Sequence, residues 1–304
     1  MKNSGLLSEN FENPRDYCYE RVCGSVSGEY PSYYMIPEEN MGTQKDQGRI
    51  GACVAETIAQ ISEEWWRRQF GKQEEHSEGF IYGALRDESH LGYGMFTSQA
   101  MKKWMEIGTL PKVMFDILIE MPELRDLIAD REDLFEVAKR YKLSAFVKLQ
   151  GANRDLQVKD ALTKYKYGLV SAGDGHCMQL VGWDDEKDVY ICRDSYGYAK
   201  DGKNGYKNKN KKKIDDIYLP LFSEVKLPFA DVKEDDWYYK NVKNLYFAGL
   251  MNGKSETSFD PQGNLTRAEV AALVDRVYSN MVNLIRTSTL NTNEKIELLE
   301  KKID

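Results

Sequence analysis

Cys53 stands in a setting that suits a nucleophile. Gly48 and Gly51 come just before it, and a strongly apolar stretch follows. The glycines predict a tight turn, so that Cys53 would be the first residue of a helix. The unpaired N–H groups and the positive dipole end of a helix start favour a thiolate over a thiol. Gln47 lies six residues upstream. Its side-chain amide and the backbone N–H of Cys53 would supply the two donors that an oxyanion needs in acyl transfer.

His176 is the histidine that fits a general base. The chain has 3 histidines, and we expect His76 and His90 to be exposed because they lie in polar stretches. His176 opens an apolar run typical of a β-strand, and a second such run ends just before Asp194. If residues 184–188 form a hairpin turn, His176 and Asp194 meet at its open end. The carboxylate would then accept the Nδ1–H of the imidazole and orient the ring.

The elements that must hold these residues follow from hydrophobic periodicity. Apolar side chains recur at three- and four-residue steps over 53–70, which predicts a helix that ends before Gly71. Residues 79–145 have a mostly helical pattern, clearest over 95–107 and 121–141. Short runs with strand character follow at 144–149, 169–172, 177–183 and 189–193. A helix-rich first half and a strand-rich second half predict an α+β domain with two lobes.

Composition limits the classes of protein to consider. The chain has 304 residues, of which 41% are hydrophobic and 12% aromatic, so it can form one domain of ordinary size and a small one. A net charge of -7 argues against nucleic acid as the main partner. The basic run 207–213 has no interleaved aromatic residues to stack on bases, and we interpret it as a solvated loop. No stretch approaches the roughly 18 consecutive apolar residues of a membrane span, and the N-terminus does not have the pattern of a signal peptide.

Cysteine usage gives no sign of a metal site. The 5 cysteines are an odd number, so at least one thiol is free or pairs between molecules. We interpret Cys18 and Cys23 as reduced thiols in an N-terminal arm. No second Cys or His pair has the spacing of zinc ligands, and neither a metal nor an organic cofactor is implied.

Several strings, in one order, resemble papain-family cysteine peptidases, especially their bacterial branch. KDQGRIGACVA is similar to the active-site turn and helix start, and GHCMQLVGWDD to the segment around the catalytic histidine. RDSYG lies where the family has an Asn-Ser-Trp-Gly element, and a Gly-Tyr follows at 205–206. Residues 77–108 also resemble the middle region of the family. The resemblance covers roughly residues 30–222 and implies a papain-like fold with a helical lobe and a β-rich lobe.

By this resemblance, Cys53 would be the nucleophile and His176 the general base and acid. Gln47 would serve the oxyanion hole, and Asp194 would orient the histidine. Tyr196 would stand where the family's tryptophan shields the hydrogen bond between histidine and asparagine. Asp194 departs from that asparagine, and a carboxylate beside the imidazole favours the imidazolium form.

Residues 229–278 predict a helix–loop–helix unit that is too small for a large core of its own. The first helix begins near Trp237 and stops at Gly249. The second opens with Thr266 and Glu269 at the spacing of a capping box, and an apolar stripe follows. Physical patterning alone goes no further than this compact pair of helices.

This segment closely resembles one S-layer homology repeat, through Phe-Ala-Asp-Val, Trp-Tyr, Ala-Gly-Leu-Met-Asn-Gly, Phe-Asp-Pro and Leu-Thr-Arg-Ala-Glu. The family implies binding to pyruvylated secondary cell-wall polysaccharide of Gram-positive bacteria. Arg267 is the residue we expect to pair with the acidic sugar, because a guanidinium binds a carboxylate through two parallel hydrogen bonds. Such repeats usually come in threes. With a single repeat, we expect either a homotrimer or a docking piece.

The chain is expected to be a cysteine peptidase that hydrolyses protein or peptide substrates at a cell wall or envelope. Two alternatives stay open: an inactive structural or adhesive part, for instance of a phage particle, and a Cys–His–Asp acyltransferase. A linker is expected at 219–228. The expected divisions are an N-terminal arm at 1–28, the peptidase domain at 29–224, the S-layer homology module at 225–280 and a helical tail at 281–304.

Overall fold

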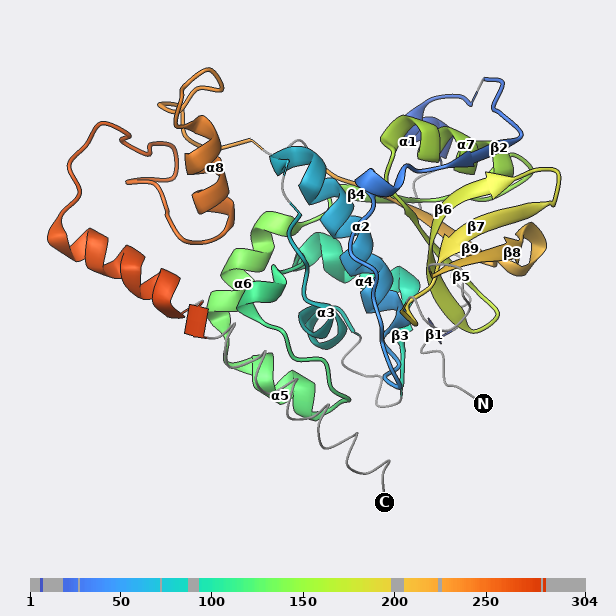
Figure 1. Ribbon diagram of the computed structural model, residues 1–304, viewed down its shortest axis with the longest axis horizontal. Helices are drawn as coiled ribbons and strands as arrows, with labels where there is room; N and C mark the ends of the chain where they lie inside the picture. The colour runs from blue at the N-terminus through green and yellow to red at the C-terminus, as the bar shows by residue number, and fades with distance from the viewer. Residues whose placement is uncertain are drawn as a thin grey trace.

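One long helix separates a group of helices from an antiparallel sheet (Figure 1). The computed structural model describes residues 6–7, 19–26, 28–71, 73–86, 93–197, 205–223, 226–279 and 281–282. The helices are α1 (Tyr19–Cys23), α2 (Cys53–Phe70), α3 (Glu78–Ala84), α4 (Thr97–Glu106), α5 (Glu123–Ala129), α6 (Glu132–Ala138), α7 (Arg154–Tyr165), α8 (Tyr239–Phe247) and a helix over 267–279. The 3₁₀ turns are η1 (Glu38–Asn40), η2 (Lys112–Met114), η3 (Lys139–Tyr141) and η4 (Lys211–Lys213). The strands are β1 (Leu6–Leu7), β2 (Tyr33–Met35), β3 (Met95–Phe96), β4 (Ala145–Lys148), β5 (Leu169–Gly173), β6 (His176–Asp184), β7 (Val189–Arg193), β8 (Tyr206–Asn210) and β9 (Asp216–Leu221).

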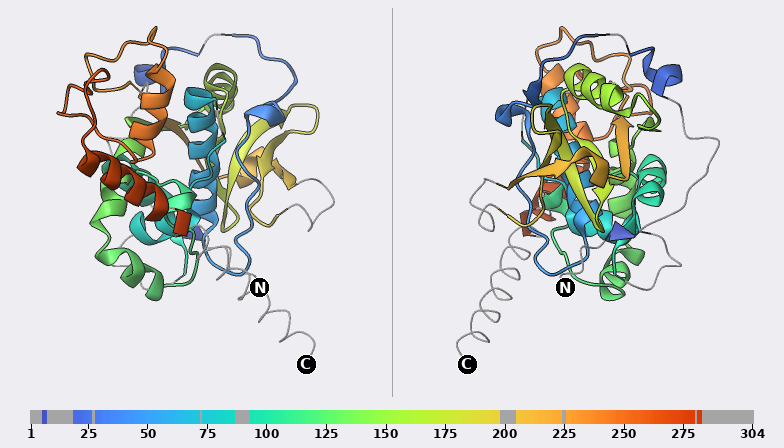
Figure 2. Two further views of the ribbon diagram at one scale, coloured as in Figure 1. Left: turned by 60° about the vertical axis from the view of Figure 1, so that its left-hand side comes forward. Right: turned by 90° about the vertical axis from the view of Figure 1, so that its right-hand side faces the viewer.

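α2 is the central element and has the bounds predicted from periodicity. It runs between the group of α3, α4, α5, α6 and α8 and the sheet (Figure 2). Its apolar residues Val54, Ile58 and Ile61 are each 0% exposed, so the helix is buried rather than half-solvated. Gly71 ends it in the left-handed region at φ 64°, where its N–H donates to the carbonyl of Arg67 at 2.7 Å. The helix therefore fixes its first residue at a defined point in the core.

The sheet brings the histidine and the carboxylate to one end of a hairpin. Its strand order is β4-β9-β5-β6-β7-β8, all neighbours are antiparallel, and β2 pairs with β6. Asp174 and Gly175 form the two-residue turn from β5 to β6, with φ of 51° and 72°. Two positive φ values are typical of the hairpin turn whose twist matches the flanking strands. His176 is thus the first residue of β6, while β7 ends just before Asp194.

Several predictions about the order of elements are confirmed and others are wrong. The strands predicted at 144–149, 169–172, 177–183 and 189–193 correspond to β4, β5, β6 and β7. The helical pattern at 121–141 is broken between α5 and α6. The linker predicted at 219–228 is wrong at its start, because Pro220 lies in β9 opposite Phe146. The pairing of β9 with β5 ends at Tyr218, so the missing N–H of Pro220 costs that pairing nothing.

The basic run 207–213 is not a solvated loop. It forms β8, at the edge of the sheet beside β7, followed by η4. Alternate lysines reach acidic partners: Lys207 pairs with Asp194, and Lys209 lies 4.0 Å from Asp174. Lys211 lies 2.8 Å from carboxylate oxygens of both Asp155 and Asp185. Lysines and asparagines alternate along this run, and a period of two residues is typical of a strand with two faces. The prediction of a loop considered only the charge of the run and not this period.

The described part of the N-terminal arm packs along α7. Tyr19 and Tyr30 both donate to the carboxylate of Asp160, at 2.6 and 2.9 Å. Cys23 is a free thiol, and Cys18 lies outside the described residues. This part of the chain thus covers one side of α7.

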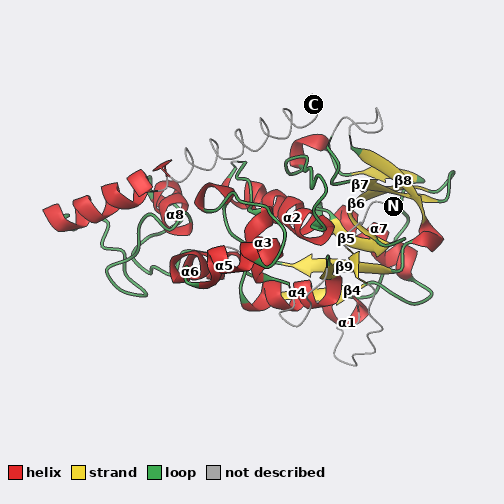
Figure 3. Ribbon diagram, turned by 90° about the horizontal axis from the view of Figure 1, so that it is seen from below, coloured by secondary structure: helices red, strands yellow, loops and turns green. Residues whose placement is uncertain are grey.

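The C-terminal module is attached to the rest of the protein through α8. Phe247 lies in the main core, 5.5 Å from the Trp66 ring by centroids, and its carbonyl accepts the Tyr141 hydroxyl at 2.8 Å. The helix over 267–279 extends away from the core (Figures 1 and 3). The predicted compact packing of the two helices is wrong, since Val270 and Val274 of the apolar stripe are 43% and 60% exposed. The tail 283–304 lies outside the described residues.

Candidate active site

Cys53 is the first residue of α2, as predicted, but its sulfur is fully buried at 0% exposure. Burial, with the neighbouring Cys177, raises the pKa of Cys53 well above its ordinary value. Hydrogen bonds from the backbone of Cys177 and Val54 lower it by less. The expectation that the helix start alone yields a thiolate is therefore wrong, because desolvation outweighs the dipole. The resting group is a thiol that needs a base.

His176 and Asp194 meet as predicted. Nε2 of His176 lies 2.7 Å from Oδ1 of Asp194, and the two residues are 8% and 2% exposed. The predicted use of Nδ1 is wrong, since the carboxylate binds the other ring nitrogen. Nδ1 is buried and has no hydrogen-bond partner among the described residues. A neutral ring that donates from Nε2 carries its lone pair on Nδ1, which is the atom that can accept a proton.

The start of β6 links the surroundings of Cys53 and His176, but among the described residues no hydrogen bond joins the sulfur to the imidazole. The sulfur of Cys53 is hydrogen-bonded by the backbone of Cys177, the residue directly after His176. Tyr196 stacks on the imidazole at 5.3 Å between centroids and 15° between planes. Burial and the nearby Cys53 raise the pKa of Tyr196. Tyr196 therefore lies beside both groups and covers the histidine, where the sequence placed it.

The carboxylate of Asp194 is held from two sides. Burial alone would raise the pKa of Asp194, but hydrogen bonds from His176 and Lys207 outweigh it and bring the pKa to about 2. Lys207 forms an ion pair with Oδ2, while the backbone N–H of Ser195 donates to Oδ1 at 2.8 Å. Lys207 is a site residue that the sequence analysis missed, because it counted the lysine run as one charged segment and not as a strand with two faces.

Gln47 is buried and fixed at both ends of its side chain. Its Oε1 accepts the Ser195 hydroxyl at 2.5 Å, and its Nε2 donates to the carbonyl of Ile50 at 2.7 Å. The backbones also pair: Gln47 N–H donates to the Ser195 carbonyl at 2.8 Å, and Gly197 N–H to that of Lys45 at 2.9 Å. The amide of Gln47 keeps a second N–H for another acceptor. The loop before α2 and the loop after β7 are thus one connected unit.

The C-terminal module contains a cavity of about 350 Å³ beside its second helix. The predicted capping box is confirmed, since Thr266 Oγ1 accepts the Glu269 N–H at 3.2 Å and Glu269 accepts the Thr266 N–H at 2.7 Å. Charged residues of the cavity include Arg276 and the pair of Lys254 with Glu269. Arg267 is exposed at the helix start and is not among the residues that line the cavity.

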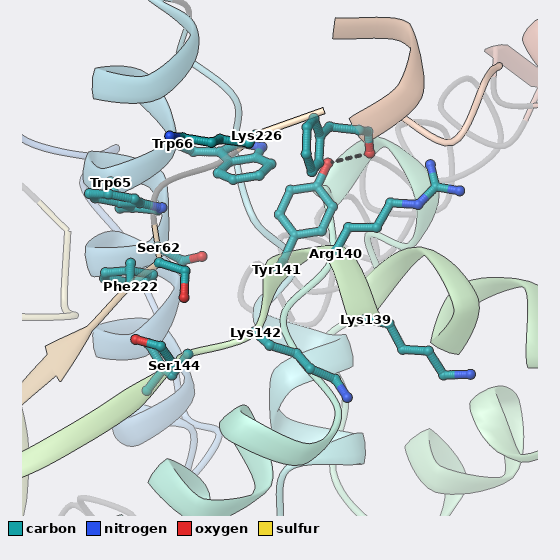
Figure 4. A pocket seen from close by; sticks show the side chains of 13 residues that line it. Ser62, Trp65, Trp66, Lys139, Arg140, Tyr141, Lys142, Ser144, Phe222 and Lys226 are labelled. Carbon is teal, nitrogen blue, oxygen red and sulfur yellow. Dashed lines mark hydrogen bonds between the residues drawn. The ribbon is translucent and has the colours of Figure 1, made fainter. Parts of the chain in front are cut away.

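A second cavity, of about 240 Å³, lies where α2 and η3 meet α8 (Figure 4). Trp65 and Phe222 stack in its wall at 4.9 Å between centroids, and Tyr141 stands opposite with Arg140 and Lys142 (Figure 4). Neither Cys53 nor His176 lines it, so this cavity is not the catalytic cleft. It marks the junction of the two parts of the chain.

Among the described residues, no helix combines the length and the hydropathy that crossing a bilayer requires. The chain offers no helical span of that kind in the part that the structure describes.

Residues 228–271 match the family model of the S-layer homology domain. Among curated proteins, an endoglucanase of Bacillus sp. (strain KSM-635) is 39% identical over 56 residues, which are 18% of this chain and 6% of that protein. The chain thus spans only a small part of that relative. The domain implies association with a cell surface.

Most of the chain is similar to solved cysteine proteases. Xylellain, from Xylella fastidiosa, is 18% identical with a TM-score of 0.59, and the match covers 73% of this chain and 97% of that one. Procathepsin L2 from Tenebrio molitor is 17% identical with a TM-score of 0.55, over 72% of this chain and 78% of that one. At such identities the likeness shows the fold, which is papain-like.

Proposed function

We propose that the protein is a cysteine peptidase that hydrolyses protein or peptide substrates at a bacterial cell envelope. The observation that carries the proposal is the 2.7 Å bond between His176 Nε2 and Asp194 Oδ1, which leaves Nδ1 as a free acceptor. The next residue of the same strand, Cys177, contacts the Cys53 sulfur through its backbone. A papain-like fold supplies the frame for this arrangement. Residues 29–224 would form the catalytic unit and residues 225–280 the envelope-binding module.

In the proposed reaction, the Cys53 sulfur attacks the peptide carbonyl carbon while its proton passes to Nδ1 of His176. Asp194 keeps the Nε2–H and stabilises the imidazolium that forms. The carbonyl oxygen becomes an oxyanion, for which the Cys53 backbone N–H and the second amide N–H of Gln47 are the proposed donors.

The tetrahedral intermediate then collapses, and the C–N bond breaks as His176 returns the proton to the leaving amine. Water, deprotonated by His176, attacks the thioester and releases the acid and the free thiol. Reducing conditions should support turnover, because oxidation of Cys53 removes the nucleophile.

Hydrolysis of a peptide library in reducing buffer tests this proposal. Wild type should cleave a subset of peptides, while Cys53→Ala should not. Cys192→Ala is the matched control, since that thiol is also buried but lies away from α2 on β7. Transfer of the acyl group to an added amine, with little hydrolysis, would instead support the acyltransferase alternative. Cleavage that survives in Cys53→Ala would contradict the assignment.

The module's finer role is also a proposal: it would bind acidic secondary cell-wall polysaccharide, with Arg267 at the sugar carboxylate. Its exposed position at the helix start leaves the guanidinium accessible. Sedimentation with purified pyruvylated cell walls should retain wild type, and Arg267→Ala should be retained less than Arg276→Ala if this assignment holds. Equal retention of both variants would place the sugar site elsewhere.

A homotrimer through the module would explain the exposed stripe of the helix over 267–279. Val270, Val274 and Val277 are 43%, 60% and 38% exposed, which is costly for three valines on one helix face. Analytical ultracentrifugation should detect a trimer that Val274→Lys weakens. A monomer at all concentrations would contradict it. Wall binding without any turnover would favour the structural alternative, for which a phage origin stays a prediction.

A further inference from the structure

We propose that Lys207 is a positioning residue for the peptidase reaction: its ammonium neutralises Asp194, so that the lysine–aspartate pair acts on His176 as a neutral group would. This inference rests on the proposed function, and it explains how an aspartate can stand at the position where similar peptidases have an uncharged asparagine. Its test has a readout that does not need turnover.

The geometry gives each oxygen of Asp194 its own partners. Oδ1 accepts from His176 Nε2 at 2.7 Å and from the Ser195 N–H at 2.8 Å. Oδ2 forms the ion pair with Lys207. A carboxylate held at both oxygens cannot rotate, so the acceptor for the imidazole stays in one place.

The sheet fixes the backbone positions of both Lys207 and Asp194. Lys207 pairs with Cys192 in the register of β7 and β8, and the Asp194 N–H donates to the Gly205 carbonyl at 2.8 Å. The ammonium also lies 5.7 Å from the centre of the Tyr196 ring, which stacks on His176. The side chain of Lys207 is 35% exposed, so it reaches Asp194 from the solvent side of the edge strand.

Other charged and titratable groups near the histidine do not replace this lysine. Cys53, from α2, is a buried thiol and uncharged at rest. Asp174, in the turn before His176, lies 4.0 Å from Lys209 and forms a second, separate pair. Asp46 faces Tyr196 across a backbone bridge and accepts the Gly48 N–H at 3.0 Å. Lys207 is thus the cation placed directly on Asp194.

The charge balance decides what the base can do. An unbalanced carboxylate in hydrogen-bond contact favours imidazolium, which cannot accept the proton of the thiol. A cation on the other carboxylate oxygen offsets part of this attraction, because its positive charge opposes a second positive charge on the ring. The pair then keeps the orienting hydrogen bond of Asp194 without holding the imidazole protonated.

The test compares four proteins in a Cys53→Ala background: the parent, Lys207→Met, Asp194→Asn and the double variant. The pH midpoint of the His176 imidazole signal is followed by NMR. We expect the midpoint to move up by about one pH unit in Lys207→Met and down by about one in Asp194→Asn. The double variant, with a neutral pair restored, should return to within about 0.3 units of the parent.

Lys209→Met is the matched control, because it removes a lysine of the same face of β8 without touching Asp194 and should leave the midpoint unchanged. Lys207→Arg keeps the charge and should behave as the parent, which also covers the case in which Lys207→Met does not fold. The proposal is overturned if the midpoint is unchanged in Lys207→Met. It is also overturned if the midpoint of the double variant differs from that of the parent as much as the midpoints of the single variants do.

The same substitutions with Cys53 intact connect the pair to turnover. Lys207→Met should move the acidic limb of the kcat/KM profile upward in pH by the same amount as the NMR midpoint, and Asp194→Asn should recover part of the activity that Lys207→Met loses. If wild type shows no turnover, the peptidase proposal fails, while the NMR midpoints still decide whether Lys207 balances Asp194.

Discussion

His76 provides a quantitative test of the buried hydrogen bonds that it forms with Ser62 of α2 and with Thr109. The sequence predicted an exposed histidine, but the side chain is 0% exposed, and that prediction is wrong. Its Nδ1 lies 2.9 Å from Ser62 Oγ and 2.9 Å from Thr109 Oγ1, partners that suit a neutral ring. Burial, reinforced by the Lys45 cation, lowers the pKa of His76 to about 3. The folded protein therefore keeps this ring neutral where the unfolded chain would protonate it.

The sign of the linkage follows from these two pKa values. The unfolded chain binds a proton as the pH falls through the ordinary value of 6.5, and the folded protein does so only near pH 3. Between these values each pH unit lost costs about 1.4 kcal/mol of the free energy of unfolding. From about pH 7 to about pH 5 the loss from His76 alone is about 2 kcal/mol.

Urea unfolding of wild type and His76→Asn at about pH 7 and about pH 5 isolates this contribution. Asparagine can keep the bonds to Ser62 and Thr109 but has no proton to gain. The variant should be less stable than wild type at neutral pH, because the smaller side chain leaves space in the core. On acidification, however, its free energy of unfolding should fall by about 2 kcal/mol less than that of wild type. An equal loss in both proteins would refute the buried neutral histidine.

Two further predictions test the site and its frame. Gln47→Ala should lower kcat by about 100-fold or more with little change in KM, because the oxyanion donor acts in the transition state. Gln157→Ala, which removes another buried glutamine on α7, is the control, and equal effects of both would contradict the assignment. Gly79→Ala should destabilise the fold, since an added Cβ would lie 1.7 Å from the Ile117 carbonyl oxygen. A Gly79→Ala protein as stable as wild type would contradict this close contact. In Gly48→Ala the added Cβ would meet nothing within 4 Å, so this variant measures the loss of stability that comes from the backbone φ of +58° alone.

The features that the sequence predicted well are those set by local pattern. α2 has the predicted bounds because apolar spacing and a terminal glycine are both local signals. The pairing of His176 with Asp194 followed from two strand patterns with a short turn between them. The capping box of Thr266 and Glu269 needs only a spacing of three residues.

The features that the sequence missed depend on burial and on distant partners. The high pKa of Cys53 comes from desolvation in the assembled core, which the helix start does not reveal. Which ring nitrogen of His176 binds Asp194 depends on the orientation of the imidazole among the side chains packed around it. The ion pair of Lys207 with Asp194 depends on the pairing of β8 with β7, because Asp194 follows the end of β7 whereas Lys207 lies in β8. A local sequence pattern does not reveal such a pairing.

Covalent labelling of Cys53 tests the central claim most directly. An epoxide inhibitor of thiol peptidases, followed by peptide mass mapping, should modify Cys53 in wild type. The labelling rate should fall strongly in His176→Ala, because burial raises the pKa of Cys53 and the thiol needs the base. Cys177 and Cys192, which are buried on β6 and β7, should stay unmodified. No adduct on Cys53 under reducing conditions, or the same labelling rate with and without His176, would contradict the proposed pair of nucleophile and base.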